Sequence, residues 1–247
     1  MIQLFLVQLF GHLVSDFYLQ GECMCASKRE KGWRSPWLYA HMVIVFLVAW
    51  CVSWSLEFWW GALVIAMLHG STDGIKACLQ KRGCDAHALF WGDQVVHVLV
   101  IALVAWLYSH CCGWTEWEWL SDYRAAMILG LTFCLWPANF FIGEFLRMIK
   151  VEKKATDDNA ETVKLTLDAS RVIGSIERVL VFLFVWLGQY SAIGFLIASK
   201  SVMRFPEMNK NNQENNAEYY LVGSLLSFGI SILIAASIMA LHGKGVF

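Results

Sequence analysis

Charged residues are scarce in this chain. Only 16% of its 247 residues are charged, against about 25% in soluble domains, and 58% are hydrophobic, with a mean hydropathy of +0.52. It has only three prolines, and its apolar runs are longer than the short alternating strands of a membrane β-barrel. Because lipid satisfies no backbone polar group, such runs must cross a membrane as helices. The composition predicts an all-α, polytopic transmembrane helix bundle.

Two further features are missing. The chain start lacks the basic residues that open a signal peptide, and His12 and Asp16 interrupt the first apolar run, so we expect this segment to be a retained span. The eight cysteines show no disulfide pattern, since Cys51, Cys78 and Cys134 lie in apolar stretches. We therefore expect no disulfide framework.

Eight apolar runs approach the roughly 20 residues that cross a bilayer. They lie near residues 1–20, 37–56, 60–78, 88–110, 124–147, 170–188, 190–204 and 218–241. With the N-terminus outside, 17 of the 19 Lys and Arg residues fall on the cytoplasmic side, and only Arg124 and Lys244 fall outside. This asymmetry follows the positive-inside rule. We expect about eight spans, with both termini outside.

Polar groups divide the chain into three parts. Residues 1–149 form a predicted five-helix region with histidines and aspartates on its first four helices, and 150–169 form a cytoplasmic linker. Residues 170–247 form a three-helix region with intramembrane Glu and Arg. The polar loops 150–169 and 205–217 are candidate contact surfaces for a cytoplasmic protein partner.

Histidine and aspartate gather at one depth of the predicted bundle. Three helices carry the two residue types four positions apart, so both side chains lie on one helix face. Their order reverses where the chain direction reverses, so each aspartate lies nearer the cytoplasm and each histidine about one turn deeper. A fourth helix adds a histidine at similar depth. The seven candidate metal ligands are His12, Asp16, His41, His69, Asp73, Asp93 and His97.

Imidazole and carboxylate together predict a divalent metal cofactor, zinc first, with manganese, iron or nickel as alternatives. Four histidines and three aspartates exceed the needs of one tetrahedral ion. They suit two ions about 3.5–4 Å apart, or one ion with spare groups that orient ligands and act as a base. A proton or ion path and a purely structural network are the competing interpretations.

Several cations lie in or near the predicted spans. Lys76 follows Asp73 by three residues and suits an anionic head group or a pairing with Asp73, whereas a snorkelling surface lysine is the plainer interpretation. Arg178 lies beside Glu177 inside the sixth predicted span, and we expect both to pair across helices. An anion clamp is the alternative. The candidate substrate-binding residues are Lys76, Arg178, Lys200 and Arg204.

Several segments resemble one family of bacterial inner-membrane proteins. They are Gly11–Gln20, His69–Lys76, Asp93–His97, Ile173–Arg178, Ala198–Phe205 and Glu218–Phe228. In these segments the chain resembles domain-of-unknown-function family 3307. The resemblance implies a multi-pass protein of the bacterial inner (plasma) membrane, and the family has no assigned activity. A looser likeness, in scattered His and Asp on short membrane helices, is to membrane-bound metal-dependent hydrolases.

These features lead to one leading hypothesis and two alternatives. The first is a metal-dependent hydrolase acting on a lipid or other amphiphile at the cytoplasmic leaflet, with Asp16 or Asp93 as the base. The alternatives are a transporter of divalent metal or protons, and a non-enzymatic stress-response or interaction protein with a structural His/Asp network. Membrane lipid is the expected partner, and no nucleic-acid partner is expected.

Overall fold

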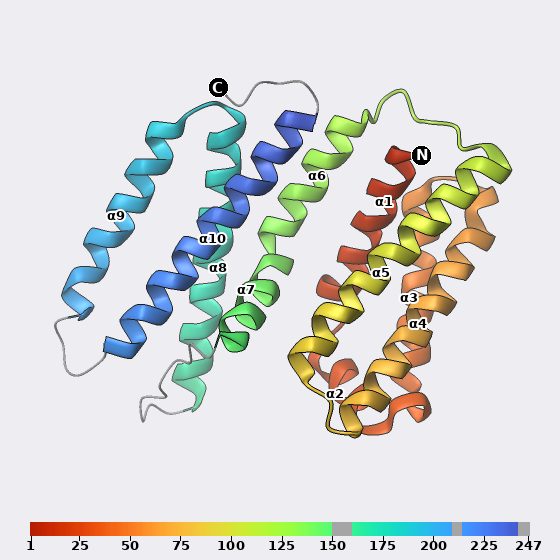
Figure 1. The fold of residues 1–247 in the computed structure, drawn as a ribbon, viewed down its shortest axis with the longest axis horizontal. Helices are drawn as coiled ribbons and strands as arrows, with labels where there is room; N and C mark the ends of the chain where they lie inside the picture. Colours follow the sequence, from red (N-terminus) through yellow and green to blue (C-terminus); the bar gives the residue numbers. More distant parts are fainter. Residues whose placement is uncertain (150–159, 209–213, 242–247) are drawn as a thin grey trace. The chain divides into compact units, whose positions relative to one another are not determined.

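The structure is a computed structural model that describes residues 1–149, 160–208 and 214–241, with side chains for 1–149, 170–202 and 222–241. Every regular element in these ranges is a helix (Figure 1), which confirms the all-α class. The chain divides into two compact units, residues 1–129 and 130–247. All eight cysteines are free, as expected.

In the first unit, α1, α3, α4 and α5 pack into a closed bundle, which can be followed in Figure 1. Helix α3 packs against α4, α4 packs against α5, and α1 packs against both α3 and α5. The elements are α1 (Ile2–Leu13), η1 (Val14–Tyr18), α2 (Glu22–Lys31), η2 (Gly32–Arg34), α3 (Pro36–Ser53), η3 (Leu56–Phe58), α4 (Trp59–Lys81), α5 (Ala86–Tyr108) and η4 (Ser109–Gly113).

Local sequence signals set the helix boundaries. Pro36 occupies the first turn of α3, where its fixed φ suits a helix start and its missing N–H is not needed. Gly83 adopts a φ of 82° between α4 and α5, a conformation that residues with a Cβ avoid. Asp85 then caps α5 by accepting a hydrogen bond from the His87 backbone N–H at 3.1 Å. The short connection makes α4 and α5 antiparallel neighbours.

Helix α2 covers one end of the bundle, here called the α2 end. The segment Glu22–Arg34 meets Ile2–Tyr18 at an angle of 86°, and α2 packs on α3 and α4. We expected only a connection at 21–36, whereas most of it is helical. Gly74 permits the close approach, because a Cβ at that position would lie 2.5 Å from the Trp33 ring.

The opposite half of the bundle, here called the far half, is apolar. Its end is closed by Gln3, which accepts a hydrogen bond from the Trp117 backbone N–H at 2.9 Å and donates one to the Leu120 carbonyl. Polar groups in the bundle therefore concentrate toward the α2 end. The buried core of the far half comprises Leu4, Val45, Ala49, Phe58, Ala62, Ile65, Ala66, Ile101, Val104, Ala105 and Tyr108.

The second unit is built mainly on α10, which packs against α8 and α7, while α9 packs against α8. The region predicted as one span at 124–147 is two helices bent by 55°. The break falls at Pro137, which removes a helical hydrogen bond. The helices from α6 on are α6 (Asp122–Leu135), α7 (Pro137–Met148), α8 (Ala160–Trp186), α9 (Tyr190–Met208) and α10 (Glu214–Leu241).

Among the described residues, fewer than eight helices are long and apolar enough to cross a membrane alone. Three described segments are, namely Pro36–Ser53, Ala86–Gly113 and Val222–Leu241, and the two bent pairs raise the number to five. Helix α4 is long enough, but it contains polar groups such as Asp73 and Lys76, which lower its hydropathy. The apolar helices indicate a membrane protein with three to five candidate spans.

Candidate metal centre

Each helix of the first bundle contributes one histidine to its interior. His12 comes from α1, His41 from α3, His69 from α4 and His97 from α5, and none is more than 6% exposed. The rings of His69 and His97 stack with centroids 3.9 Å apart. The His41 ring lies 5.1 Å from that of His69, and the His12 ring 5.1 Å from that of His97. The structure therefore gathers the four predicted histidines in one layer.

Three ligand atoms form a nearly equilateral triangle. Asp16 Oδ1 lies 3.3 Å from His41 Nε2 and 3.2 Å from His69 Nε2, and the two imidazole nitrogens are 3.1 Å apart. Hydrogen bonds suit such a triangle poorly, because a proton on one edge points about 60° away from the third atom. A tetrahedral ion about 2.0–2.1 Å from each ligand sets them about 3.3 Å apart. The triangle fits one such ion.

Asp16 reaches this position from a π-helical turn. Element η1 follows α1 directly, and the Leu19 backbone N–H donates to the Val14 carbonyl at 3.0 Å, an i to i+5 bond. Single π-turns in helices occur frequently at functional sites. The turn leaves Asp16 Oδ1 3.8 Å from His12 Nδ1, the i,i+4 pairing that the sequence predicted.

Asp73 lies beside the triangle and is held from α2. Its Oδ2 is 3.9 Å from His41 Nε2 and 4.0 Å from His69 Nε2, and it accepts a hydrogen bond from Lys28. The pairing of Asp73 with Lys76 that we considered from sequence is wrong. Lys76 donates to Asp93 Oδ2 at 2.7 Å instead, across the contact between α4 and α5.

A hydrogen-bond chain fixes the proton position on His12. Gln94 Nε2 donates to Asp93 Oδ2 at 3.3 Å, which turns Gln94 Oε1 toward His12 Nε2 at 3.4 Å. Because an amide oxygen only accepts, His12 must donate from Nε2 and leave a lone pair on Nδ1. Metal-binding histidines are oriented by such outer partners. His12 is therefore prepared to bind an ion through Nδ1.

Charge and unpaired atoms at this layer also suit a cation. With neutral histidines, three carboxylates face the ammonium groups of Lys28 and Lys76, so one net negative charge is buried. A divalent ion with a bound hydroxide makes the layer neutral, which lowers the cost of burial. Among the described residues, the buried atoms His41 Nδ1, His97 Nδ1 and Asp93 Oδ1 have no hydrogen-bond partner. Such atoms commonly mark an ion or water.

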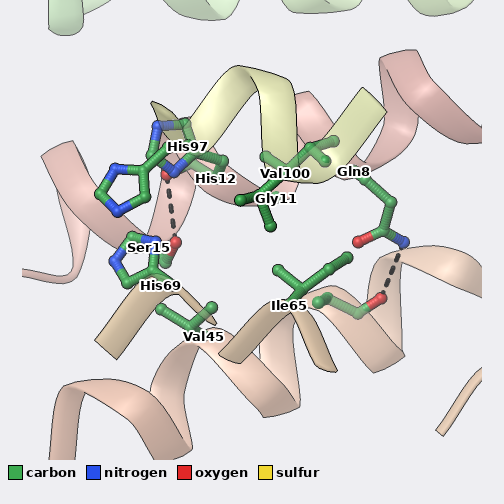
Figure 2. Close-up of a pocket in the computed structure, with 11 residues that line it drawn as sticks. Gln8, Gly11, His12, Ser15, Val45, Ile65, His69, His97 and Val100 are labelled. Atoms are coloured by element: carbon green, nitrogen blue, oxygen red, sulfur yellow. Dashed lines mark hydrogen bonds between the residues drawn. The ribbon is translucent and has the colours of Figure 1, made fainter. Parts of the chain in front are cut away.

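A small cavity of about 10 Å³ adjoins the histidines on the side of the far half. Figure 2 shows His12, His69 and His97 at one end of it and Gln8 at the other. Apolar side chains, among them Val45 and Ile65, form walls between the two ends. About 10–15 Å³ is the smallest space that holds one water molecule. The cavity therefore has room for a single water.

We predict that Lys28→Met destabilises the protein strongly. The change removes the ammonium partner of Asp73, whose carboxylate is 7% exposed, and breaking a buried pair costs about 3–5 kcal/mol. Arg29→Met is the matched control, since Arg29 is exposed on the same helix. Unfolding in mixed detergent micelles measures the difference. Equal stability of the two variants would show that the pair with Asp73 contributes little.

Two basic residues of the second unit, Arg178 and Lys200, pair with groups on neighbouring helices. The Arg178 side chain is 2% exposed and donates to the Cys134 carbonyl at 2.8 Å and to Asn139 Oδ1 at 2.7 Å. Lys200 on α9 forms an ion pair with Glu177 on α8. This agrees with the interhelical pairing that we expected for Glu177. The Arg204 side chain lies outside the described residues. A substrate role for these residues stays a prediction.

Residues 4–121 match a family model described as "Protein of unknown function (DUF3307)". That part of the chain belongs to this family. The matched residues include all seven candidate ligands, together with Lys28 and Lys76. Searches of curated proteins and of solved structures found no match. The three resembling segments from Ile173 onward lie beyond the matched residues, so their part of the resemblance stays a prediction, as does the likeness to metal-dependent hydrolases.

Proposed function

We propose that this protein is a membrane-embedded, metal-dependent hydrolase that acts on a lipid or another amphiphile at the α2 end of its first bundle. The observation that carries the proposal is the triangle of Asp16 Oδ1, His41 Nε2 and His69 Nε2, with edges of 3.1–3.3 Å. Its spacing suits a zinc-like ion, and its imidazole and carboxylate donors are those of zinc hydrolases.

Neighbouring groups complete the proposed site. Asp73 and His12 are the next ligands, since Asp73 Oδ2 lies within 4.0 Å of both triangle nitrogens and His12 Nδ1 lies 3.8 Å from Asp16 Oδ1. Zinc is the first choice, with manganese, iron or nickel as alternatives. A bound divalent ion supplies a water of lowered pKa and polarises the scissile carbonyl or phosphoryl group.

Asp93 is the better candidate for the general base. Its Oδ2 is hydrogen-bonded to Lys76, whereas its Oδ1 is buried without a hydrogen-bond partner among the described residues. A base must remain free to accept a proton. Asp16, the other predicted base, lies within the triangle and serves better as a ligand. Lys76, 24% exposed at its side chain, is placed to meet an anionic head group.

The apolar interior of the far half makes transport of an ion through the bundle unfavourable. A transported ion needs polar groups along its whole path, but the interior beyond Gln8 is filled by the apolar core of the far half. Gln3, which lies beyond Gln8 on the same helix, is engaged with the backbone carbonyls of Trp117 and Leu120. A polar site with an apolar interior beyond it favours an enzyme over a channel.

The proposal includes a topology, with about eight spans and both termini outside, in a bacterial inner membrane. The proposed cytoplasmic partner surfaces at 150–169 and 205–217 lie largely outside the described side chains. Because 17 of 19 basic residues would face the cytoplasm, reporter fusions should place positions 30, 155 and 210 inside. Positions 115 and 244 should lie outside. Access to position 30 from outside would contradict this orientation.

Hydrolysis is tested with the purified full chain in vesicles of phosphatidylethanolamine and phosphatidylglycerol, supplemented with lipid extract. Mass spectrometry should detect a hydrolysed lipid when the protein carries zinc. Removal of zinc by a chelator should lower the rate at least 100-fold, and added zinc should restore it. If no lipid class is hydrolysed by protein shown to hold metal, the hydrolase proposal is wrong.

A further inference from the structure

Gln8 is a buried polar residue that the metal ligands do not use. It is 2% exposed on α1, one turn from His12 toward the far half. Its Nε2 donates to the Ala49 carbonyl at 3.0 Å, and a carbonyl only accepts. The amide orientation is therefore fixed, and Oε1 must point the other way.

Gln8 Oε1 is buried and has no hydrogen-bond partner among the described residues. Figure 2 shows this oxygen turned into the cavity that His12, His69 and His97 border at its other end. An unpaired buried carbonyl oxygen is costly. A single water would satisfy it, and the cavity of about 10 Å³ is just large enough.

The cavity offers a water further polar partners. Ser15 lines it, and its Oγ donates to the His12 carbonyl at 3.1 Å, which leaves the oxygen lone pairs available. Three histidine rings also line it. Buried waters typically need two to four polar partners. The site therefore meets the requirements of volume, polarity and enclosure.

We propose that the cavity holds a water that binds the ion of the metal centre from the far-half side, and that Gln8 is its positioning residue. This inference rests on the proposed hydrolase function. A water that donates to Gln8 Oε1 turns a lone pair toward the histidine layer, where an ion would bind it.

The proposal makes Gln8 an orienting acceptor and no base, because an amide does not take up a proton at neutral pH. Replacement of an outer-shell partner typically costs 10–100-fold in activity. We expect Gln8→Leu to lower lipid hydrolysis about 100-fold, with metal affinity changed less than about threefold.

Four proteins test the water directly: wild type, Gln8→Leu, Gln8→Glu and Gln3→Leu. Glutamate keeps an acceptor oxygen, and Gln3 is an equally buried glutamine of α1, also 2% exposed, that does not line the cavity. Pulsed EPR of the manganese-loaded proteins in ¹⁷O-water counts the waters bound to the ion. Gln8→Leu should bind one water fewer than the other three.

A crystal or electron-microscopy structure at a resolution that shows waters provides a second measurement, independent of metal. Density within hydrogen-bond distance of Gln8 Oε1 is expected in the wild type and not in Gln8→Leu. An empty wild-type cavity overturns the inference whether or not metal binds. Equal water counts in metal-loaded wild type and Gln8→Leu overturn it while leaving the metal centre intact. Failure of every variant to bind metal overturns the proposed function itself.

Discussion

Replacing His69 with alanine is expected to abolish metal binding. His69 Nε2 is part of the triangle, and the His69 side chain belongs to two of the overlapping groups able to hold an ion, one with His12, Asp16 and His97 and one with His41 and Asp73. Loss of an outer partner alone lowers metal affinity 10–100-fold. Loss of a direct ligand such as His69 should lower the zinc affinity more than 100-fold. Titration of the metal-free protein with zinc measures the affinity.

The chain supplies matched controls for this result. His110 is exposed in η4, and His87 lies in the first turn of α5, near the start of that helix. His110→Ala and His87→Ala should retain the wild-type affinity, whereas His41→Ala should behave like His69→Ala. Circular dichroism excludes loss of the fold. Equal zinc affinity in His69→Ala and His110→Ala would favour the structural network.

Asp93→Asn is expected to separate metal binding from catalysis. Asp93 Oδ2 pairs with Lys76 at 2.7 Å, and Oδ1 is available as a proton acceptor. Asparagine preserves size and part of the hydrogen bonding but does not accept a proton. General-base catalysis contributes about 10²–10⁴-fold, so lipid hydrolysis should fall by about 10³-fold while zinc content stays near one per chain.

Asp16→Asn provides the contrast, because Asp16 Oδ1 is a vertex of the triangle. This variant should lose zinc and hydrolysis together. If Asp93→Asn keeps both zinc and full hydrolysis, Asp93 is not the base. If it loses zinc as completely as Asp16→Asn, Asp93 is a ligand, and the two-ion arrangement considered from sequence gains support.

Helical periodicity and the depth of each residue in its predicted span are enough to predict that these residues gather at one site. Residues four apart share a helix face, so His12 with Asp16 and His69 with Asp73 point inward together once the helices pack. His41 had no partner on its own helix, and only its depth in the sequence suggested its place. Its 3.1 Å approach to His69 Nε2 confirms that inference.

Other contacts of the site join residues that are far apart in sequence, and helical periodicity does not predict them. Lys28 stands 45 positions from Asp73, and the two meet because the chain bends by 86° after η1. Sequence spacing favoured Lys76 as the partner of Asp73, because it is nearer in sequence. In the structure, the Lys76 side chain pairs with Asp93 on α5 instead. The role of Gln8 was also missed, since a lone glutamine in an apolar run signals little until its neighbours are known.

The ends of several helices were predicted well, whereas the number of membrane spans was not. The segments predicted at 37–56, 60–78 and 88–110 correspond to α3, α4 and α5. Residues such as Asp73 and Lys76 both create the site and lower the hydropathy of α4, so the functional helix is the least membrane-like of the three. The break at Pro137 was missed, because the long apolar run around this proline was predicted as one span at 124–147.

Metal analysis of the purified wild-type chain shows whether the first bundle binds an ion. Inductively coupled plasma mass spectrometry, after exchange into chelator-treated buffer, should find about one divalent ion per chain, zinc first. One ion is expected because three carboxylates and two lysines leave a single buried negative charge, which one divalent ion with hydroxide neutralises. A chain that holds no metal, and takes up none when zinc is supplied, would contradict the account.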